Sequence, residues 1–291
     1  NEKINWIPEH LKHGRFENSV EAAPDWNISR NRYWASPLPF WKCEKCEKTE
    51  CVGSLDEIKK RSPANNTYIL MRHGESQHNL TDAVSCKPDP KNTLTETGRE
   101  QVLESAKNLK KEKIDIIYCS DLERARETAH IVAKEIGVAS ENIFSTSEIS
   151  ELNAGIYDGK TWKEYREFFA TPESRFDTAP KDGETLLDLH RRSMKFIYDL
   201  EKKHHGKKIL IVSHGDVLYF MDAGSRGLLK NALIRDFQLN TKLKTAEWRE
   251  LSFSPIPHNK NFELDFHRPY IDVITFTCAC GGQMKRVSEV I

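Results

Sequence analysis

Residues 67–79 read "TYILMRHGESQHN", an apolar run of strand length that gives way at once to charged and small residues. The same arrangement occurs twice more, where "IDIIYC" (114–119) leads into "SDLERAR" and "KILIV" (208–212) leads into "SHGD". Short apolar runs bounded by polar residues are typical of strands that are buried on both faces. These segments predict a sheet whose functional residues follow the ends of its strands.

Helical patterns lie between these strands, with apolar residues at helical spacing. Long helices are predicted at residues 94–111, 120–136 and 184–203. Ser120 and Glu123 stand in capping-box register at the start of the second helix. Residues 245–253 alternate like a last strand. Alternation of strands and helices predicts an α/β domain with a mostly parallel sheet over about residues 66–254.

Composition sets broad limits on function. With 291 residues, of which 38% are hydrophobic, the chain can bury a sizeable core. Its 44 basic and 44 acidic side chains cancel, so no overall charge draws it to nucleic acid or membrane. No apolar run approaches the roughly 20 residues of a membrane helix. Because the chain opens at Asn1 without a signal segment, we expect a piece of a longer protein.

The seven cysteines include two closely spaced pairs, Cys43 with Cys46 and Cys278 with Cys280. Tetrahedral structural zinc takes four ligands, and each pair supplies half of such a site. An odd number of cysteines in this spacing favours reduced thiols and a metal over disulfides, so we expect a cytoplasmic protein. Four unrelated free thiols are the alternative.

The residues that follow the three strands have a chemistry in common. Arg72, His73 and Gly74 follow the first, Arg124 and Arg126 the second, and His214 and Gly215 the third. A guanidinium matches the oxygens of a phosphate, and a neutral imidazole can attack phosphorus. A glycine behind each histidine would let backbone approach a ligand. Other histidines, namely His78, His130 and His190, are expected to be structural.

The order "LMRHGESQHN", "LTETGREQ", "SDLERARETA", "SELNAGIYDG", "DGETLLDLHRR" and "ILIVSHGDVL" closely resembles the histidine phosphatase superfamily. The resemblance implies the phosphoglycerate mutase-like fold, a three-layer α/β/α domain. It also implies a metal-free reaction on a small phosphorylated substrate. The roles it assigns are nucleophile for His73, clamps on the phosphoryl oxygens for Arg72 and Arg124, second histidine for His214, phosphate contact for Asn79 and proton donor for Glu151.

Two features bear on the kind of reaction. "AGIYDGKT" (154–161) fits a loose phosphate-binding-loop pattern, but the polar segment before it is unlike the buried strand such a loop follows. Residues 160–183 lack the longer segment by which mutases of this fold keep water out, so the resemblance favours hydrolysis. Residues 80–93 depart from the pattern of members that act on small sugar phosphates, which leaves the ester open.

The flanks carry a second resemblance. Residues 1–62, with "DWNISRNRYW", and residues 255–291, with "FTCACGGQMK", are similar to one continuous stretch of isoleucyl-tRNA synthetase. This implies a phosphatase domain inserted between the halves of a zinc knuckle, in a small zinc-ribbon-like lobe formed by both chain ends, with Cys43, Cys46, Cys278 and Cys280 as ligands. The "HIGH" and "KMSKS" signatures are absent. We therefore expect tRNA and ATP to be bound by the full-length protein only.

Three hypotheses remain open at this point. The insert can be an active phosphatase, a catalytically silent spacer or phosphate-binding module, or a regulator of the synthetase that senses a phosphorylated ligand. The complete set of His73, His214, Arg72, Arg124 and Glu151 favours the first.

Overall fold

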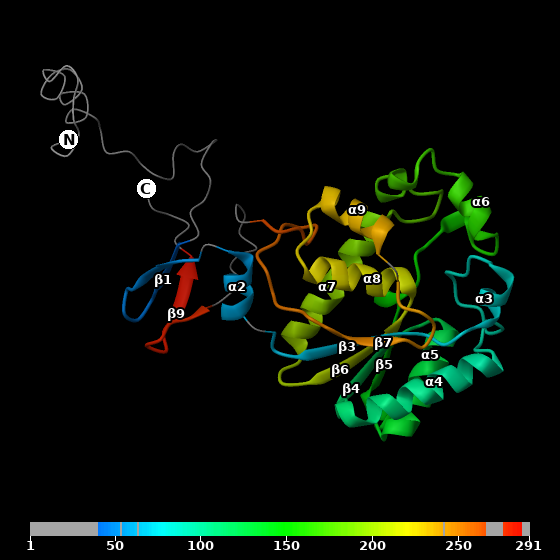
Figure 1. Cartoon of the computed structure of the whole chain (residues 1–291), viewed down its shortest axis with the longest axis horizontal. Helices are drawn as coiled ribbons and strands as arrows, with labels where there is room; N and C mark the ends of the chain where they lie inside the picture. Colours follow the sequence, from blue (N-terminus) through cyan, green and yellow to red (C-terminus); the bar gives the residue numbers. More distant parts are fainter. Residues whose placement is uncertain (1–39, 53, 63, 241, 266–275, 287–291) are drawn as a thin grey trace, which may run out of the picture.

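The computed structural model describes residues 40–52, 54–62, 64–240, 242–265 and 276–286 (Figure 1). Residues 64–265 contain a five-stranded sheet of order β5-β4-β6-β3-β7. Its strands are β3 (Thr67–Arg72), β4 (Ile116–Ser120), β5 (Ile143–Thr146), β6 (Lys208–Ser213) and β7 (Trp248–Leu251). Only the edge strand β7 runs antiparallel to its neighbour β3, which confirms the prediction of a mostly parallel sheet.

Helices cover both faces of this sheet. Because successive strand residues point to opposite faces, Tyr68 and Leu70 enter one apolar cluster and Ile69 and Met71 the other. The helices α7 (Leu186–Lys203) and α8 (Gly215–Ser225) pack in the first cluster, and α4 (Glu96–Leu109) and α5 (Glu123–Ile136) pack in the second. Figure 1 shows the two helix pairs on opposite sides of the sheet, as a three-layer α/β/α domain requires.

The predicted helices are present, with one error at a terminus. Thr95 caps α4, and Thr185 caps α7 through a capping box with Asp188. The capping box predicted for Ser120 and Glu123 is wrong, because α5 begins two residues later, at Glu123, with Leu122 at its N-cap. Ser120 is the last residue of β4 instead, and its hydroxyl accepts a hydrogen bond from the Leu122 amide at 3.2 Å.

The remaining elements of this unit are shorter. They are α3 (Gln77–Thr81), α6 (Trp162–Glu167), α9 (Lys230–Leu239) and the 3-10 helices 110–112, 140–142, 147–149, 155–157 and 172–176. Figure 1 places α3 and α6 at the same end of the sheet. Among the described residues no helix is long and apolar enough to cross a membrane.

Segments from both ends of the chain form a second sheet. Its order is β2-β1-β9-β8, with β1 (Phe40–Cys43), β2 (Thr49–Cys51), β8 (Phe276–Thr277) and β9 (Gln283–Arg286), and α2 (Leu55–Arg61) follows β2. Cys43 lies opposite Met284 in the β1–β9 pair, so strands more than 200 residues apart in sequence are hydrogen-bonded neighbours. The predicted lobe formed by both chain ends is therefore present as a sheet.

The first and last strands of the larger sheet are also neighbours. Tyr68 of β3 lies opposite Leu251 of β7 in an antiparallel pair. The chain thus enters and leaves this α/β unit at adjacent points. This is the geometry that lets a domain be inserted without separating the segments before and after it.

Candidate active site at the carboxyl ends of the strands

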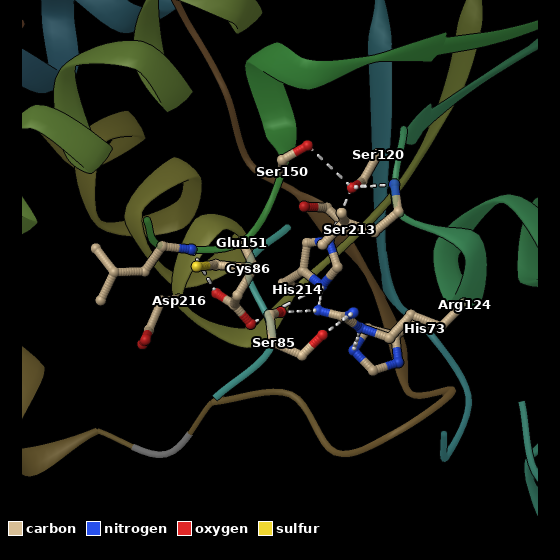
Figure 2. A network of polar contacts seen from close by, with 12 residues as sticks. His73, Ser85, Cys86, Ser120, Arg124, Ser150, Glu151, Ser213, His214 and Asp216 are labelled. Carbon is tan, nitrogen blue, oxygen red and sulfur yellow. Dashed lines mark hydrogen bonds and ion pairs between the residues drawn. The ribbon is translucent and has the colours of Figure 1, made fainter. Parts of the chain in front are cut away.

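Three buried side chains meet where β3, β4 and β6 end. His73 follows β3, Arg124 lies in the first turn of α5, and His214 is the N-cap of α8. Their exposed fractions are 1%, 1% and 0%. The guanidinium of Arg124 lies between the two imidazoles, as Figure 2 shows: its Nε donates to His73 Nε2 and its Nη2 donates to His214 Nδ1, both at 3.2 Å.

These contacts fix the tautomers of both histidines. His73 Nδ1 carries the proton, because it donates to the Gly74 carbonyl oxygen at 2.7 Å, and the Nε2 lone pair faces Arg124. His214 has the opposite arrangement, since its Nε2 donates to the Ser120 hydroxyl at 2.9 Å (Figure 2). Ser120 in turn contacts Ser150 Oγ at 3.3 Å. The side chain assigned to a helix cap from the sequence therefore orients a site histidine.

Electrostatics keep both imidazoles neutral. Burial, followed by the positive charges of Arg124 and Arg72, lowers the pKa of His73 well below its usual value. Burial and Arg124 lower the pKa of His214 in the same way. A neutral imidazole has a free lone pair, which an imidazolium lacks. His73 Nε2 is thus held in the protonation state of a nucleophile.

Arg72 and Gly215 adjoin this group. Arg72 Nη1 donates to the Leu243 carbonyl oxygen at 2.9 Å, whereas its buried Nε has no hydrogen-bond partner among the described residues. A Cβ placed on Gly215 would lie 3.6 Å from the Arg72 guanidinium carbon. That distance is ordinary van der Waals contact, so Gly215, the first residue of α8, lies next to the Arg72 side chain.

Glu151 is the acidic member of the site. Its Oε2 lies 3.8 Å from His214 Nδ1, and its Oε1 accepts from the Leu152 amide at 2.9 Å. Burial and the negative charge of Asp216 raise the pKa of Glu151, against the opposing effect of Arg124. Asp216 itself forms an ion pair with Lys242; burial disfavours its charge, but Lys242 lowers the pKa of Asp216 below its usual value. No role for Asp216 or Lys242 was expected from the sequence.

A cavity of about 220 Å³ opens beside these residues. Its lining residues are Arg72, His78, Asn79, Asp82, Glu151, Trp162, Arg166, Arg175, Gly215, Asp216 and Lys242. A neighbouring cavity of about 320 Å³ shares His78 and runs along residues 77–92 to Gly159. His78, expected to be structural, is therefore a wall residue of both cavities. Asn79 lies in the wall as well, but its Oδ1 accepts from the Ser76 amide at 2.9 Å, which leaves only its amide nitrogen for a ligand.

Segment 83–86 covers the buried arginine. Arg124 Nη2 donates to the Ser85 carbonyl oxygen at 3.0 Å, and Figure 2 shows Ser85 beside the guanidinium. The segment is held by the residues that follow the "AGIY" turn: the amide of Val84 donates to the Lys160 carbonyl oxygen at 2.7 Å, and the amide of Gly159 donates to the Val84 carbonyl oxygen at 2.8 Å. Residues 80–93, which the sequence marked as atypical, thus form part of the site.

The glycines behind the histidines differ in purpose. A Cβ on Gly74 would lie 2.6 Å from the Gly98 carbonyl oxygen, so Gly74 allows α4 to approach the loop. The expectation that Gly74 makes room for a ligand is wrong for that reason. "AGIYDGKT" does not form a phosphate-binding loop either, because it contains a 3-10 turn at Gly155–Tyr157 and leads into the six-residue helix α6.

The four paired cysteines gather in the smaller sheet. The Sγ atoms of Cys43, Cys46, Cys278 and Cys280 all lie within 4.8 Å of one another. Cys43 and Cys280 are 3.5 Å apart, and Cys46 and Cys278 are 3.6 Å apart. A zinc ion with four Zn–S bonds of about 2.3 Å has sulfurs about 3.8 Å apart, so the cluster fits such an ion. A Cβ on Gly282 would approach Cys43 Sγ to 2.7 Å, which excludes a larger residue there.

Known protein families match both the α/β unit and the N-terminal flank of the chain. Residues 68–256 match the histidine phosphatase superfamily (branch 1), and residues 1–110 match the class I tRNA synthetases (I, L, M and V). An isoleucine–tRNA ligase of Dehalococcoides mccartyi is 56% identical over 61 residues, which are 21% of this chain and 6% of that protein. One from Treponema denticola is 58% identical over 62 residues, with the same shares. The matched region is thus a small part of those synthetases.

Solved structures resemble the α/β unit. Alpha-ribazole phosphatase from Shigella flexneri is 25% identical with a TM-score of 0.54, covering 68% of this chain and 94% of that one. YhfR of Bacillus stearothermophilus is 22% identical with a TM-score of 0.55, covering 78% and 98%. A mycobacterial glucosyl-3-phosphoglycerate phosphatase, solved with VO3, is 23% identical with a TM-score of 0.54, covering 64% and 90%. The last two comparisons establish a shared fold.

Proposed function

The chain belongs to the histidine phosphatase superfamily (branch 1), and we propose that its α/β domain hydrolyses phosphomonoesters through a phosphohistidine on His73. The observation that carries this proposal is the meeting of two neutral, buried imidazoles with Arg124, beside Arg72 and a buried Glu151 whose pKa is raised. A decayed or purely binding pocket has no need of a nucleophile and a proton donor together. The alternative of a silent module is therefore less well supported.

In the first step His73 Nε2 attacks phosphorus, and the bond from phosphorus to the ester oxygen breaks. Glu151 gives its proton to the departing oxygen, which leaves as an alcohol. The hydrogen bond from Nδ1 to Gly74 holds the ring in its attacking orientation and disperses the charge that forms on it. In the second step water attacks the phosphohistidine, Glu151 takes a proton from that water, and inorganic phosphate leaves.

Arg124 and Arg72 are the proposed binding groups for the phosphoryl oxygens, and His214 is proposed as the second histidine of the pocket, which positions Arg124 through its Nδ1. Donors that are fixed before the reaction stabilise the charge of the transition state without reorganising. Arg124 now donates from Nη2 to the Ser85 carbonyl oxygen and from Nε to the lone pair of His73 Nε2, so the phosphoryl group has to exchange both contacts as it enters. Asn79, through its amide nitrogen, and Gly215 are proposed as further contacts.

We propose the same division of the chain that the sequence indicated: a phosphatase domain at 66–254, between synthetase-like segments at 1–62 and 255–291. The four-cysteine cluster is proposed to hold structural zinc, with Cys43, Cys46, Cys278 and Cys280 as ligands. Aminoacylation, with tRNA and ATP as partners, is proposed for a longer isoleucyl-tRNA synthetase that would contain this chain.

Hydrolysis of 4-nitrophenyl phosphate by the native chain and by His73→Ala tests the proposal. Loss of the nucleophile should reduce kcat by about 10³-fold or more. His130→Ala is the matched control, because His130 is exposed on α5 away from the site, and it should keep full activity. An acid-labile phosphoprotein should be trapped from the native chain and from the control. Equal turnover by native chain and His73→Ala would refute the nucleophile.

A further inference from the structure

The cavity beside Glu151 has more positive charge than one phosphoryl group requires. Besides Arg72, its lining includes Arg166 of α6, Arg175 of the 3-10 helix Pro172–Phe176, and Lys242. Lys242 is neutralised by its ion pair with Asp216. For the guanidiniums of Arg166 and Arg175, no ion pair with a carboxylate occurs among the described residues.

The acidic residues of the cavity do not offset these two arginines. Asp216 is committed to Lys242, and burial together with the charge of Asp216 raises the pKa of Glu151, which disfavours the charge of that carboxyl. Asp82 is exposed at the end of α3, where water screens its charge. Two unpaired cations therefore face a cavity whose inner end is formed by Arg72, Glu151 and Gly215.

Arg175 is held in place toward this cavity. Its guanidinium carbon lies 5.5 Å from the centre of the Tyr165 ring and 5.7 Å from that of Phe237. Its Nε is buried, yet has no hydrogen-bond partner in the described part of the chain. A buried donor without a partner is costly unless a ligand satisfies it. Arg166 of α6 is an exposed residue that lines the same cavity.

We propose that the substrate is a phosphomonoester whose leaving group carries a second anionic group, either carboxylate or phosphate, which Arg166 and Arg175 bind. The reacting phosphoryl group lies against His73 and Arg72, and the leaving group extends along the cavity to the two arginines. This inference rests on the proposed phosphatase activity and adds the substrate class. Hydrogen bonds between a guanidinium and an anion are strong enough to change kcat/KM by about tenfold or more.

Three esters that share one three-carbon chain provide the test. The far carbon carries a hydroxyl in 3-hydroxypropyl phosphate, is itself the carboxylate carbon in 3-(phosphonooxy)propanoate, and carries a second phosphate in propane-1,3-diyl bisphosphate. The native chain should hydrolyse at least one of the two anionic-tail esters with a kcat/KM about tenfold or more above that of the hydroxyl ester. The better of the two identifies the second group.

Arg166→Gln and Arg175→Gln should each lower the preference, which is the ratio of kcat/KM for the better anionic-tail ester to kcat/KM for the hydroxyl ester, toward one. Arg126→Gln is the matched control, since Arg126 is a half-exposed arginine on α5 whose ion pair is with Glu123, and its preference should equal that of the native chain. Arg175→Gln also removes the contacts of Arg175 with two aromatic rings, so this variant can misfold. Among the described residues Arg166 has no such ring contact. If Arg175→Gln misfolds, the result for Arg166→Gln is decisive. Equal kcat/KM for all three esters, or a preference unchanged in both pocket variants, overturns the inference while the phosphatase stands. No hydrolysis of any ester by the folded chain overturns both.

Discussion

The pKa of Glu151 is raised because its surroundings make the ionised form costly. The carboxyl is buried, and the negative charge of Asp216 adds to the effect of burial. Asp216 stays ionised because of Lys242. At the scale of single residues, the proposed catalysis thus depends on two carboxyl groups whose pKa values are shifted in opposite directions by their surroundings.

The pH dependence of the reaction should reveal this arrangement. Loss of the Glu151 proton removes the acid, so kcat/KM should fall as the pH rises through the raised pKa of Glu151. In Asp216→Asn the like charge is gone and Lys242 is left unpaired, both of which lower that pKa. The alkaline limb of the kcat/KM profile should therefore shift to lower pH, by about one unit or more. A limb at the same pH in variant and native chain, measured with the same ester, would contradict this account.

At the scale of elements, the loop that orients His73 depends on close contact with α4. A Cβ on Gly98 of α4 would lie 2.0 Å from the Glu75 carbonyl oxygen, and one on Gly74 would lie 2.6 Å from the Gly98 carbonyl oxygen. The two backbones pack directly against each other. The loop that contains the Gly74 carbonyl, the acceptor for His73 Nδ1, is thereby fixed by a helix that contributes no side chain to the proposed chemistry.

Gly98→Ala should push this loop and helix apart. The clash outweighs the helix propensity gained by alanine, and we expect a net loss of about 1–3 kcal/mol in the free energy of unfolding. Activity should fall with it, because the His73 ring loses its fixed acceptor. Gly137→Ala serves as the control: it has a φ of 81° and no atom within 4 Å of a new Cβ, so it should cost about 1 kcal/mol in strain and leave kcat/KM unchanged. Denaturant unfolding and ester hydrolysis measure the two effects.

At the scale of the whole molecule, the two sheets have different sources of stability. The larger sheet is covered by helices on both faces, whereas the smaller one has, among the residues that the structure describes, a buried cluster of six that includes Cys43 and Cys278. A core that small is seldom sufficient alone, so bound metal should supply much of the stability of the smaller sheet. The α/β domain has a complete core of its own.

Removal of metal should therefore destabilise the smaller sheet and leave the α/β domain active. Metal analysis should find about one zinc per chain. Chelation, or Cys43→Ser, should release it and lower the thermal stability of the smaller sheet, while hydrolysis of 4-nitrophenyl phosphate continues. Cys119→Ser is the control, because Cys119 is buried in β4 away from the cluster, and it should retain the zinc. Loss of phosphatase activity on chelation, with the α/β domain still folded, would count against a metal-free reaction.

The sequence by itself determined the elements of this protein and most of its candidate site. Apolar runs located β3, β4 and β6, since the burial of a central strand excludes polar residues along its whole length. The residues directly after those runs, His73, Arg124 and His214, followed because parallel strands bring their carboxyl ends to one edge. The short spacing within each cysteine pair, which is also a local pattern, located the four thiols of the cluster.

The tertiary structure alone decided how these residues are supported. The pairing of Asp216 with Lys242, the contact of Ser120 with His214 and the convergence of Arg166 and Arg175 on one cavity left no pattern in the sequence. Periodicity reports how a residue is buried within its own element. It carries no information about which distant residue lies opposite, and that depends on how loops of irregular backbone close over the sheet. For this reason the proposed phosphate chemistry could be inferred from the sequence, whereas the substrate class had to be inferred from the fold.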